Sequence, residues 1–140
     1  MTSFSGPVAP STPTARLVID NSALIDSFVF GTATDDWAQV ELHAPTLIAY
    51  EFAHAIRSNV HIGRIRASEG REAIESFLEL HITRHPAEPL LRAMWSLRHD
   101  VSAYDVSYVA LAQALGVPLL TCDRRLARTA TRWCDVIVPN

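Results

Sequence analysis

Two short apolar runs that each end on an aspartate constrain the fold of this chain more than any other feature. Residues 16–20 read RLVID and residues 117–123 read VPLLTCD, and both have the length and branched apolar composition of buried strands. Longer segments with helical periodicity separate such runs. Strands that alternate with helices pair in parallel, so we expect an α/β fold in which one sheet lies between two layers of helices.

The expected elements fill one domain, which a chain of 140 residues accommodates. Helices are expected at residues 22–29, 35–42, 47–62, 68–81, 87–99, 102–116 and 124–130, and strands at 16–20, 43–46, 82–86, 117–123 and 134–139. Residues 1–15 are rich in proline, serine and threonine, so we expect a disordered N-terminal extension before a domain at 16–140.

The absence of lysine excludes several function classes, since all twelve basic residues are arginine. A Walker A phosphate loop, a CheY-like receiver domain and Schiff-base chemistry each require a lysine. Two cysteines do not make a disulfide framework, and no stretch is long enough to span a membrane. We therefore expect a reduced, cytoplasmic protein with no membrane association.

Four acids occupy positions where carboxylates are not expected. Asp20 and Asp123 end buried strands, whereas Glu51 and Asp105 lie on apolar sides of predicted helices. Each strand-end acid could simply be the N-cap of the next helix, and that interpretation stays open for each acid alone. Four converging carboxylates would repel one another, by about 1 to 4 kcal/mol for each pair near 4 Å, unless a cation or raised pKa values relieve them.

An all-carboxylate site selects a hard cation, Mg²⁺ or Mn²⁺. Such an ion binds through a few carboxylates, keeps several waters and contacts substrate phosphate. The matching chemistry is phosphodiester hydrolysis, in which the metal activates a water and neutralises charge on the phosphorus and the leaving oxygen.

Three stretches resemble the motifs of PIN-domain ribonucleases, most closely the VapC-type toxins of toxin–antitoxin pairs. They are VIDNSAL at 18–24, APTLIAYEFAHAI at 44–56 and YDVSYVALAQALGVPLLTCDRRLA at 104–127. The resemblance runs from about Arg16 to Val138. It implies a PIN-like three-layer sandwich with a central, mostly parallel β-sheet flanked by helices.

The resemblance also assigns roles to individual positions. It implies a catalytic, metal-binding quartet supported by two hydroxyls, at Asp20, Glu51, Asp105 and Asp123 with Ser22 and Thr121. The implied protein is a Mg²⁺-dependent endoribonuclease, with Mn²⁺ as a possible substitute, that acts on RNA, forms a homodimer and is neutralised by a VapB-type antitoxin. Departures from the family pattern are mild: His54 replaces a common asparagine, and Arg124 and Arg125 replace the commoner lysine.

Three further interpretations remain open at this point. Arg124 and Arg125 could hold RNA phosphates or could be solvated residues of a helical turn. The spacing of His81 and His85 is that of a zinc pair on a helix, although no third ligand is evident. The alternatives to a nuclease are a PIN-like scaffold that binds RNA or a partner without cleavage, and a phosphatase of the haloacid dehalogenase type. The phosphatase would need an aspartate where Ser22 stands.

Overall fold

The computed structural model describes residue 6 and residues 15–31 and 39–139. The strands are β1 (Ala15–Ile19), β2 (Val40–Pro45), β3 (Ile82–His85), β4 (Leu119–Leu120) and β5 (Val136–Ile137). The helices are α1 (Asn21–Phe30), α2 (Leu47–His61), α3 (Ala67–Glu79), α4 (Leu91–Ser96), α5 (Ala103–Leu115) and α6 (Arg124–Ala130), with a 3₁₀ turn η2 (Glu88–Leu90) before α4.

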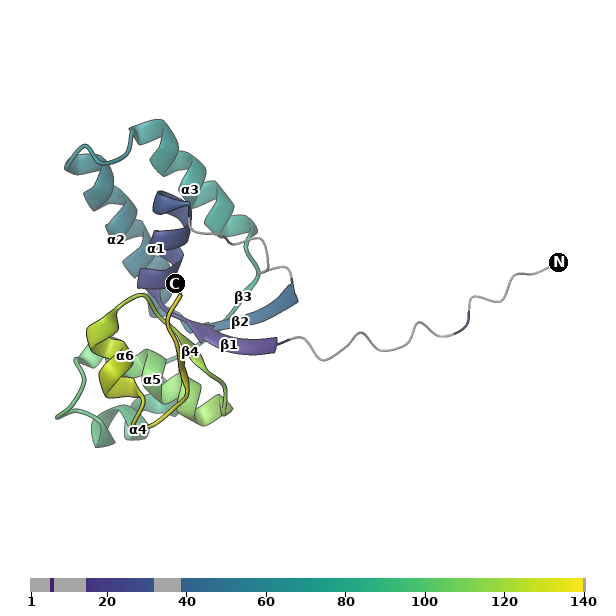
Figure 1. The fold of residues 1–140 in the computed structure, drawn as a ribbon, viewed down its shortest axis with the longest axis vertical. Coiled ribbons are helices and arrows are strands. Elements are labelled where there is room, and N and C mark those ends of the chain that lie inside the picture. Colours follow the sequence, from purple (N-terminus) through teal and green to yellow (C-terminus); the bar gives the residue numbers. More distant parts are fainter. Residues whose placement is uncertain (1–5, 7–14, 32–38, 140) are drawn as a thin grey trace.

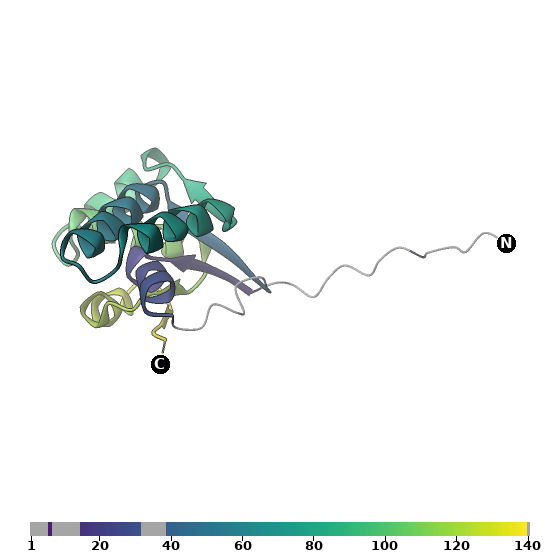
Figure 2. The same ribbon diagram turned by 90° about the horizontal axis from the view of Figure 1, so that it is seen from above.

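The five strands form one sheet in the order β3-β2-β1-β4-β5, and every neighbouring pair is parallel. Helices α1, α2 and α3 lie on one side of the sheet, and α4, α5 and α6 lie on the other (Figure 1). Seen from above, α2 and α3 lie across the sheet in front of its strands (Figure 2). The predicted three-layer α/β sandwich is confirmed.

The strand order reverses between β1 and β4, which fixes where a ligand site forms. From β1 the chain adds β2 and β3 on one side, and it then returns to add β4 and β5 on the other. Ile19 pairs with Leu120, so the residues that follow these two strands emerge next to each other. In open parallel sheets such a reversal opens a crevice at the carboxyl ends of the strands, where ligands bind.

Helix packing is tight on both sides of the sheet. Helix α5 is apolar on most of its sides, and the run from Val106 to Ala112 is buried throughout. On the other side α2 and α3 stack Phe52 on Phe77 with ring centroids 4.6 Å apart. A Cβ atom on Gly70 would lie 2.9 Å from Val60 Cγ2, so glycine allows these two helices to approach closely.

The predicted helices at 22–29, 47–62, 68–81, 102–116 and 124–130 are confirmed with shifts of one or two residues. The predicted helix at 35–42 is wrong at residues 40–42, which belong to β2 because Val40 and Leu42 pair with β1. Sheet pairing there overrides a local helical pattern; residues 35–38 lie outside the described residues. The expectation for residues 1–15 also falls outside them, apart from Gly6 and Ala15, where β1 begins.

Membrane insertion finds no support in the described part of the chain. None of its helices has the length and apolarity that a crossing would require.

Candidate active site

Asp20 follows β1 directly and is the most buried of the four predicted acids, with 4% of its surface exposed. It is the N-cap of α1, and its Oδ1 accepts hydrogen bonds from the Ala23 amide at 3.0 Å and from Ser22 Oγ at 2.7 Å. Its Oδ2 accepts a short hydrogen bond from Thr121 Oγ1. The cap interpretation is therefore correct for Asp20, but capping does not explain two further hydroxyl donors on one carboxylate.

Thr121 and Ser22 tie the ends of β1 and β4 together. Their hydroxyl oxygens lie 3.2 Å apart, and Ser22 Oγ accepts the backbone amide of Cys122 at 2.9 Å. Thr121 Oγ1 accepts the backbone amide of Asp123 at 3.0 Å. Both hydroxyls therefore support Asp20 in the way that the resemblance implies, and they link it to the strand end that carries Asp123.

Asp123 itself is exposed and caps α6, with Oδ1 accepting the amides of Arg125 at 3.0 Å and Leu126 at 3.1 Å. This acid fits the capping interpretation better than the other three do. Its Oδ2 atom accepts no hydrogen bond from the described residues, so Asp123 can give one oxygen to a ligand while the cap stays intact.

Glu51 lies in the second turn of α2, half-buried, where it meets the middle of α5. Its Oε1 accepts a short hydrogen bond from the hydroxyl of Tyr108, which is 1% exposed. Asn21, the first residue of α1, donates Nδ2 to the backbone carbonyl of Glu51 at 3.5 Å. The Oδ1 atom of Asn21 is buried and has no hydrogen-bond partner among the described residues, so an oxygen acceptor next to Asp20 is left unsatisfied.

Asp105 lies in the first turn of α5, partly buried. Ser102 caps this helix and donates Oγ to Asp105 Oδ2 at 3.0 Å. Apart from this hydroxyl, the Asp105 carboxylate has no hydrogen bond or ion pair in the described part of the chain, which leaves most of its acceptor capacity free.

Asp20, Glu51 and Asp105 form one electrostatic group. Burial raises the pKa of the Asp20 carboxyl above its ordinary value, against the lowering effect of the Thr121 and Ser22 hydroxyls, and the charge of Asp105 raises it further. Burial likewise raises the pKa of Glu51, and the charges of Asp105 and Asp20 add to that effect. Each charge thus acts on its neighbours. We call Asp20, Glu51, Asp105 and Asp123 the acidic edge.

The chemistry of the acidic edge fits a hard divalent cation. Its donors are carboxylate oxygens with one unsatisfied amide oxygen nearby, and no cationic side chain is paired with Asp20, Glu51 or Asp105 among the described residues. Within those residues no group of three or more acidic, histidine or cysteine side chains is arranged so that it could hold a metal ion by itself. A Mg²⁺ ion, which binds through one or two carboxylates and keeps its waters, would not need such a group.

A polar hollow of about 170 Å³ lies beside the acidic edge. Asp105 and Asp123 line it together with Arg125 and residues of the turn before α5. Arg124 lines a different hollow, with Arg128 and the C-terminal Val138. The structure therefore separates the two arginines that the sequence treated as a pair, since Arg125 lines the hollow beside Asp105 and Asp123 and Arg124 does not.

The zinc pair that the sequence suggested at His81 and His85 finds no geometric support. Residues 82–85 form β3, so His81 and His85 are separated by about 13 Å of extended chain and do not share a helix face. His85 instead lies 2.9 Å from His43, through Nε2 and Nδ1. Burial, with nearby Asp26 and Asp20, raises the pKa of Cys122 to about 11, which disfavours a thiolate nucleophile at neutral pH.

Sequence reasoning missed Tyr108, Ser102 and Asn21. Tyr108 follows Asp105 by three residues and so lies on the same side of α5. Ser102 precedes Asp105 by three, which is the spacing of a helix cap. These two signals were readable. The contact of Asn21 with α2 depends on how α1 packs, and nothing local in the sequence indicates it.

Comparison with known proteins finds matches over most of the chain. A family model described as "PIN domain" matches residues 17–132. The VapC ribonuclease Mb0985 of Mycobacterium bovis is 37% identical over 123 residues, which are 87% of this chain and 97% of the relative. Ribonuclease VapC1 of Mycobacterium tuberculosis is 42% identical over 95 residues, 67% of this chain and 71% of the relative.

Two solved structures share the fold. PAE2754 from Pyrobaculum aerophilum aligns with a TM-score of 0.65 and 20% identity, covering 96% of this chain and 92% of that one. VapBC-5 from Mycobacterium tuberculosis, described as a member of the VapBC family of toxin–antitoxin systems, aligns with a TM-score of 0.57 and 17% identity, covering 89% of this chain and 99% of that one. At these identities the similarity establishes the fold alone.

Proposed function

This chain belongs to the PIN-domain family, and within it to the VapC ribonucleases, and on that premise we propose that it is a metal-dependent endoribonuclease toxin. Its substrate would be RNA, and its cofactor Mg²⁺, with Mn²⁺ as a substitute. The observation that carries the proposal is the acidic edge. Burial and the nearby charge of Asp105 raise the pKa values of the Asp20 and Glu51 carboxyls, and no cationic side chain among the described residues is paired with these acids.

The four acids would have different roles at the metal ion, depending on how firmly each side chain is held. Asp20, fixed by two hydroxyls and an amide, would be the rigid ligand, and Asp105, with a single hydroxyl donor, the second direct ligand. Glu51 would complete the negative site from α2, and Asp123 would contribute through its free Oδ2. A bound Mg²⁺ supplies an activated water and neutralises charge on the scissile phosphate.

Substrate phosphate would be held beside the acids by Arg125, which lines the same hollow as Asp105 and Asp123. A guanidinium presents several donors to phosphate oxygens in a fixed geometry. Arg124 is a weaker candidate for contact with the RNA segment that is cleaved, because it lines the other hollow, between α6 and Val138 and Pro139. It could contact the RNA at nucleotides farther from the cleaved bond.

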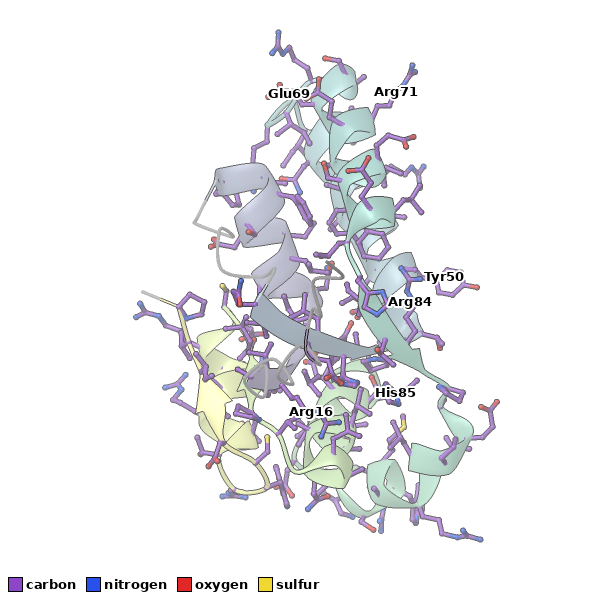
Figure 3. All side chains as sticks on the ribbon, turned by 90° about the vertical axis from the view of Figure 1, so that its right-hand side faces the viewer. Arg16, Tyr50, Glu69, Arg71, Arg84 and His85 are labelled. Carbon is purple, nitrogen blue, oxygen red and sulfur yellow. The ribbon has the colours of Figure 1, made fainter. Side chains whose placement is uncertain are left out.

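We also propose a VapB-type antitoxin and a homodimeric state. Large apolar side chains that are mostly exposed support protein partners, among them Tyr50 on α2 and Leu78 on α3, which are 77% and 67% exposed. Tyr50 projects away from its helix (Figure 3). Two free cysteines support a reducing compartment, the cytoplasm.

The test is cleavage of a structured RNA by the purified full chain, free of antitoxin, with and without Mg²⁺ or Mn²⁺. We expect cleavage that EDTA abolishes and that Asp105→Asn removes. Asp135→Asn is the matched control, because Asp135 is an exposed acid that precedes β5 and has no side-chain partner among the described residues. RNA binding without cleavage, at any metal concentration, would favour the scaffold alternative. Release of phosphate from small phosphomonoesters would favour the phosphatase.

A further inference from the structure

We propose that Tyr108 is a positioning residue that holds the Glu51 carboxylate in place for the metal ion. The inference rests on the proposed function and adds a residue to it that touches neither metal nor substrate. It concerns how a half-buried glutamate with several side-chain torsions can be held in one position at a metal site.

One helix supplies both an acid and the group that orients another acid. Asp105 and Tyr108 are three positions apart in α5 and so lie on one side of the helix. From there the Tyr108 hydroxyl reaches across to α2 and donates to Glu51 Oε1. Glu51 Oε2 accepts no hydrogen bond within the described part of the chain, so it is available to a ligand while Oε1 is held.

The tyrosine is well suited to fix a geometry. Its ring is 1% exposed, and neighbouring positions of α5, including Val109, are also buried. A buried aromatic ring has few accessible rotamers, so its hydroxyl occupies a defined point. Glutamate has three side-chain torsions and would otherwise sample many positions from the surface of α2.

A purely structural role explains the contact less well. A buried tyrosine hydroxyl needs a hydrogen-bond partner, but a backbone carbonyl would satisfy it without drawing a carboxylate out of water. Here the partner is a half-buried carboxylate that two other carboxylates, Asp20 and Asp105, already repel. A phenylalanine at this position would avoid that arrangement. The arrangement makes sense where a cation joins the group.

The experiment compares Tyr108→Phe with Tyr104→Phe. Both changes remove one hydroxyl from α5, but Tyr104 is 66% exposed and its hydroxyl has no hydrogen-bond partner among the described residues. Mn²⁺ binding to the full chain, followed by calorimetry or by electron paramagnetic resonance, is the readout, with metal-free melting as the test of folding. Loss of a group that orients a metal ligand weakens metal binding by about 10- to 100-fold, and we expect the lower end for Tyr108→Phe and no change for Tyr104→Phe.

A second pair of variants keeps the inference testable if Tyr108→Phe lowers stability. If Tyr108 acts through Glu51, Tyr108→Phe should weaken Mn²⁺ binding in the native background but add nothing to Glu51→Gln. Equal effects in both backgrounds, or a Mn²⁺ dissociation constant within about twofold of wild type, would overturn the proposal for Tyr108 and leave the ribonuclease proposal standing. Absence of Mn²⁺ binding by wild type would overturn both.

Discussion

The sheet carries two polar clusters, and they differ in whether their charges are balanced. The acidic edge gathers four carboxylates at the carboxyl ends of the strands. A second cluster, the histidine cluster, consists of Arg16, Glu41, His43 and His85 on β1, β2 and β3. Within it His43 Nε2 lies 2.7 Å from Glu41 Oε1, His43 Nδ1 lies 2.9 Å from His85 Nε2, and Arg16 Nε lies 3.4 Å from Glu41 Oε1.

The histidine cluster is complete without any ligand. Both nitrogens of the buried His43 ring have partners, and Glu41 has a cation beside it. Arg16 and His85 mark the two ends of this chain of contacts (Figure 3). The acidic edge has one sign of charge and an unsatisfied amide oxygen beside it. Burial of polar groups alone therefore does not indicate a functional site; a group of like charges without a counter-charge is the stronger indication.

The largest expected effect comes from removing one charge of the acidic edge. Asp20→Asn should lower RNA cleavage by at least about a hundredfold, because even residues that only orient a metal ligand cost up to that much. The fold should persist, since an asparagine oxygen can still accept the Ala23 amide and the Ser22 hydroxyl. Initial cleavage rates at saturating Mg²⁺ measure the effect. An active Asp20→Asn/Asp105→Asn variant would remove both residues from the site.

Breaking the histidine cluster should have the opposite consequence. His43→Phe leaves His85 Nε2 without its His43 partner, while Glu41 keeps only Arg16, and the loss of the buried His43 hydrogen bonds should lower the free energy of unfolding by about 1–3 kcal/mol. Mn²⁺ affinity should not change, because the cluster does not contact the acidic edge. Urea unfolding and Mn²⁺ titration of the same samples measure the two effects. His81→Ala, at an exposed histidine just before β3, is the control and should change neither.

The two clusters should also give opposite dependences of stability on pH. The pKa values of Asp20 and Glu51 are raised, so in the absence of metal these carboxyls bind protons more tightly in the folded state than in the unfolded chain. Their contribution to the free energy of unfolding therefore declines as the pH rises from the ordinary carboxyl pKa through the raised pKa of the folded state. Burial and the neighbouring His43 lower the pKa of His85, so its contribution is lost as pH falls below its ordinary value of about 6.5.

The melting-temperature difference between Asp20→Asn and wild type should therefore widen as pH rises above about 4, in metal-free buffer. The melting-temperature difference between wild type and His43→Phe should instead become smaller as the pH falls below about 6.5. Differences that do not depend on pH would mean that neither cluster titrates on folding.

The smallest expected effect separates the two adjacent arginines. Arg125→Gln should weaken RNA binding by an inactive Asp105→Asn protein more than Arg124→Gln does, because only Arg125 shares the hollow with the acids. Removing one phosphate contact on a single strand should lower the slope of log affinity against log salt by about 0.7. If the two variants give equal slopes of log affinity against log salt, the structure does not distinguish the arginines, and both are better described as solvated residues.

Most of the fold was predictable because its signals are local. Apolar runs that end on acids and helices with clear caps, such as α5 closed by Gly116, can be read from neighbouring residues. The first half of β2, residues 40–42, could not, since its pairing with β1 is a contact between distant segments, whereas the strand predicted at 43–46 is confirmed at residues 43–45. Boundaries of β4 and β5 were too long for the same reason, as each strand pairs over only two residues.

The positions of the candidate acids could be predicted from the sequence, but the neighbouring residues that hold them or lie beside them could not. Strand ends and inward helix faces mark Asp20 and Asp105 without knowledge of the packing. The hydrogen bond from Tyr108 to Glu51 depends on where α2 meets α5, and the separation of Arg125 from Arg124 depends on the rotation of α6. Such details are set by tertiary contacts, which periodicity does not record.

The central claim is that the acidic edge is incomplete until a divalent cation binds, and the thermal melting of antitoxin-free protein tests it most directly. An ion that binds only the folded chain should stabilise wild type by about 2.7 kcal/mol at a hundredfold excess over its dissociation constant. The Asp20→Asn/Asp105→Asn protein should melt higher than wild type without metal and respond little to Mg²⁺. Melting at several protein concentrations separates metal binding from dissociation of a dimer. No shift of the wild-type melting temperature at millimolar Mg²⁺ or Mn²⁺ would contradict the account.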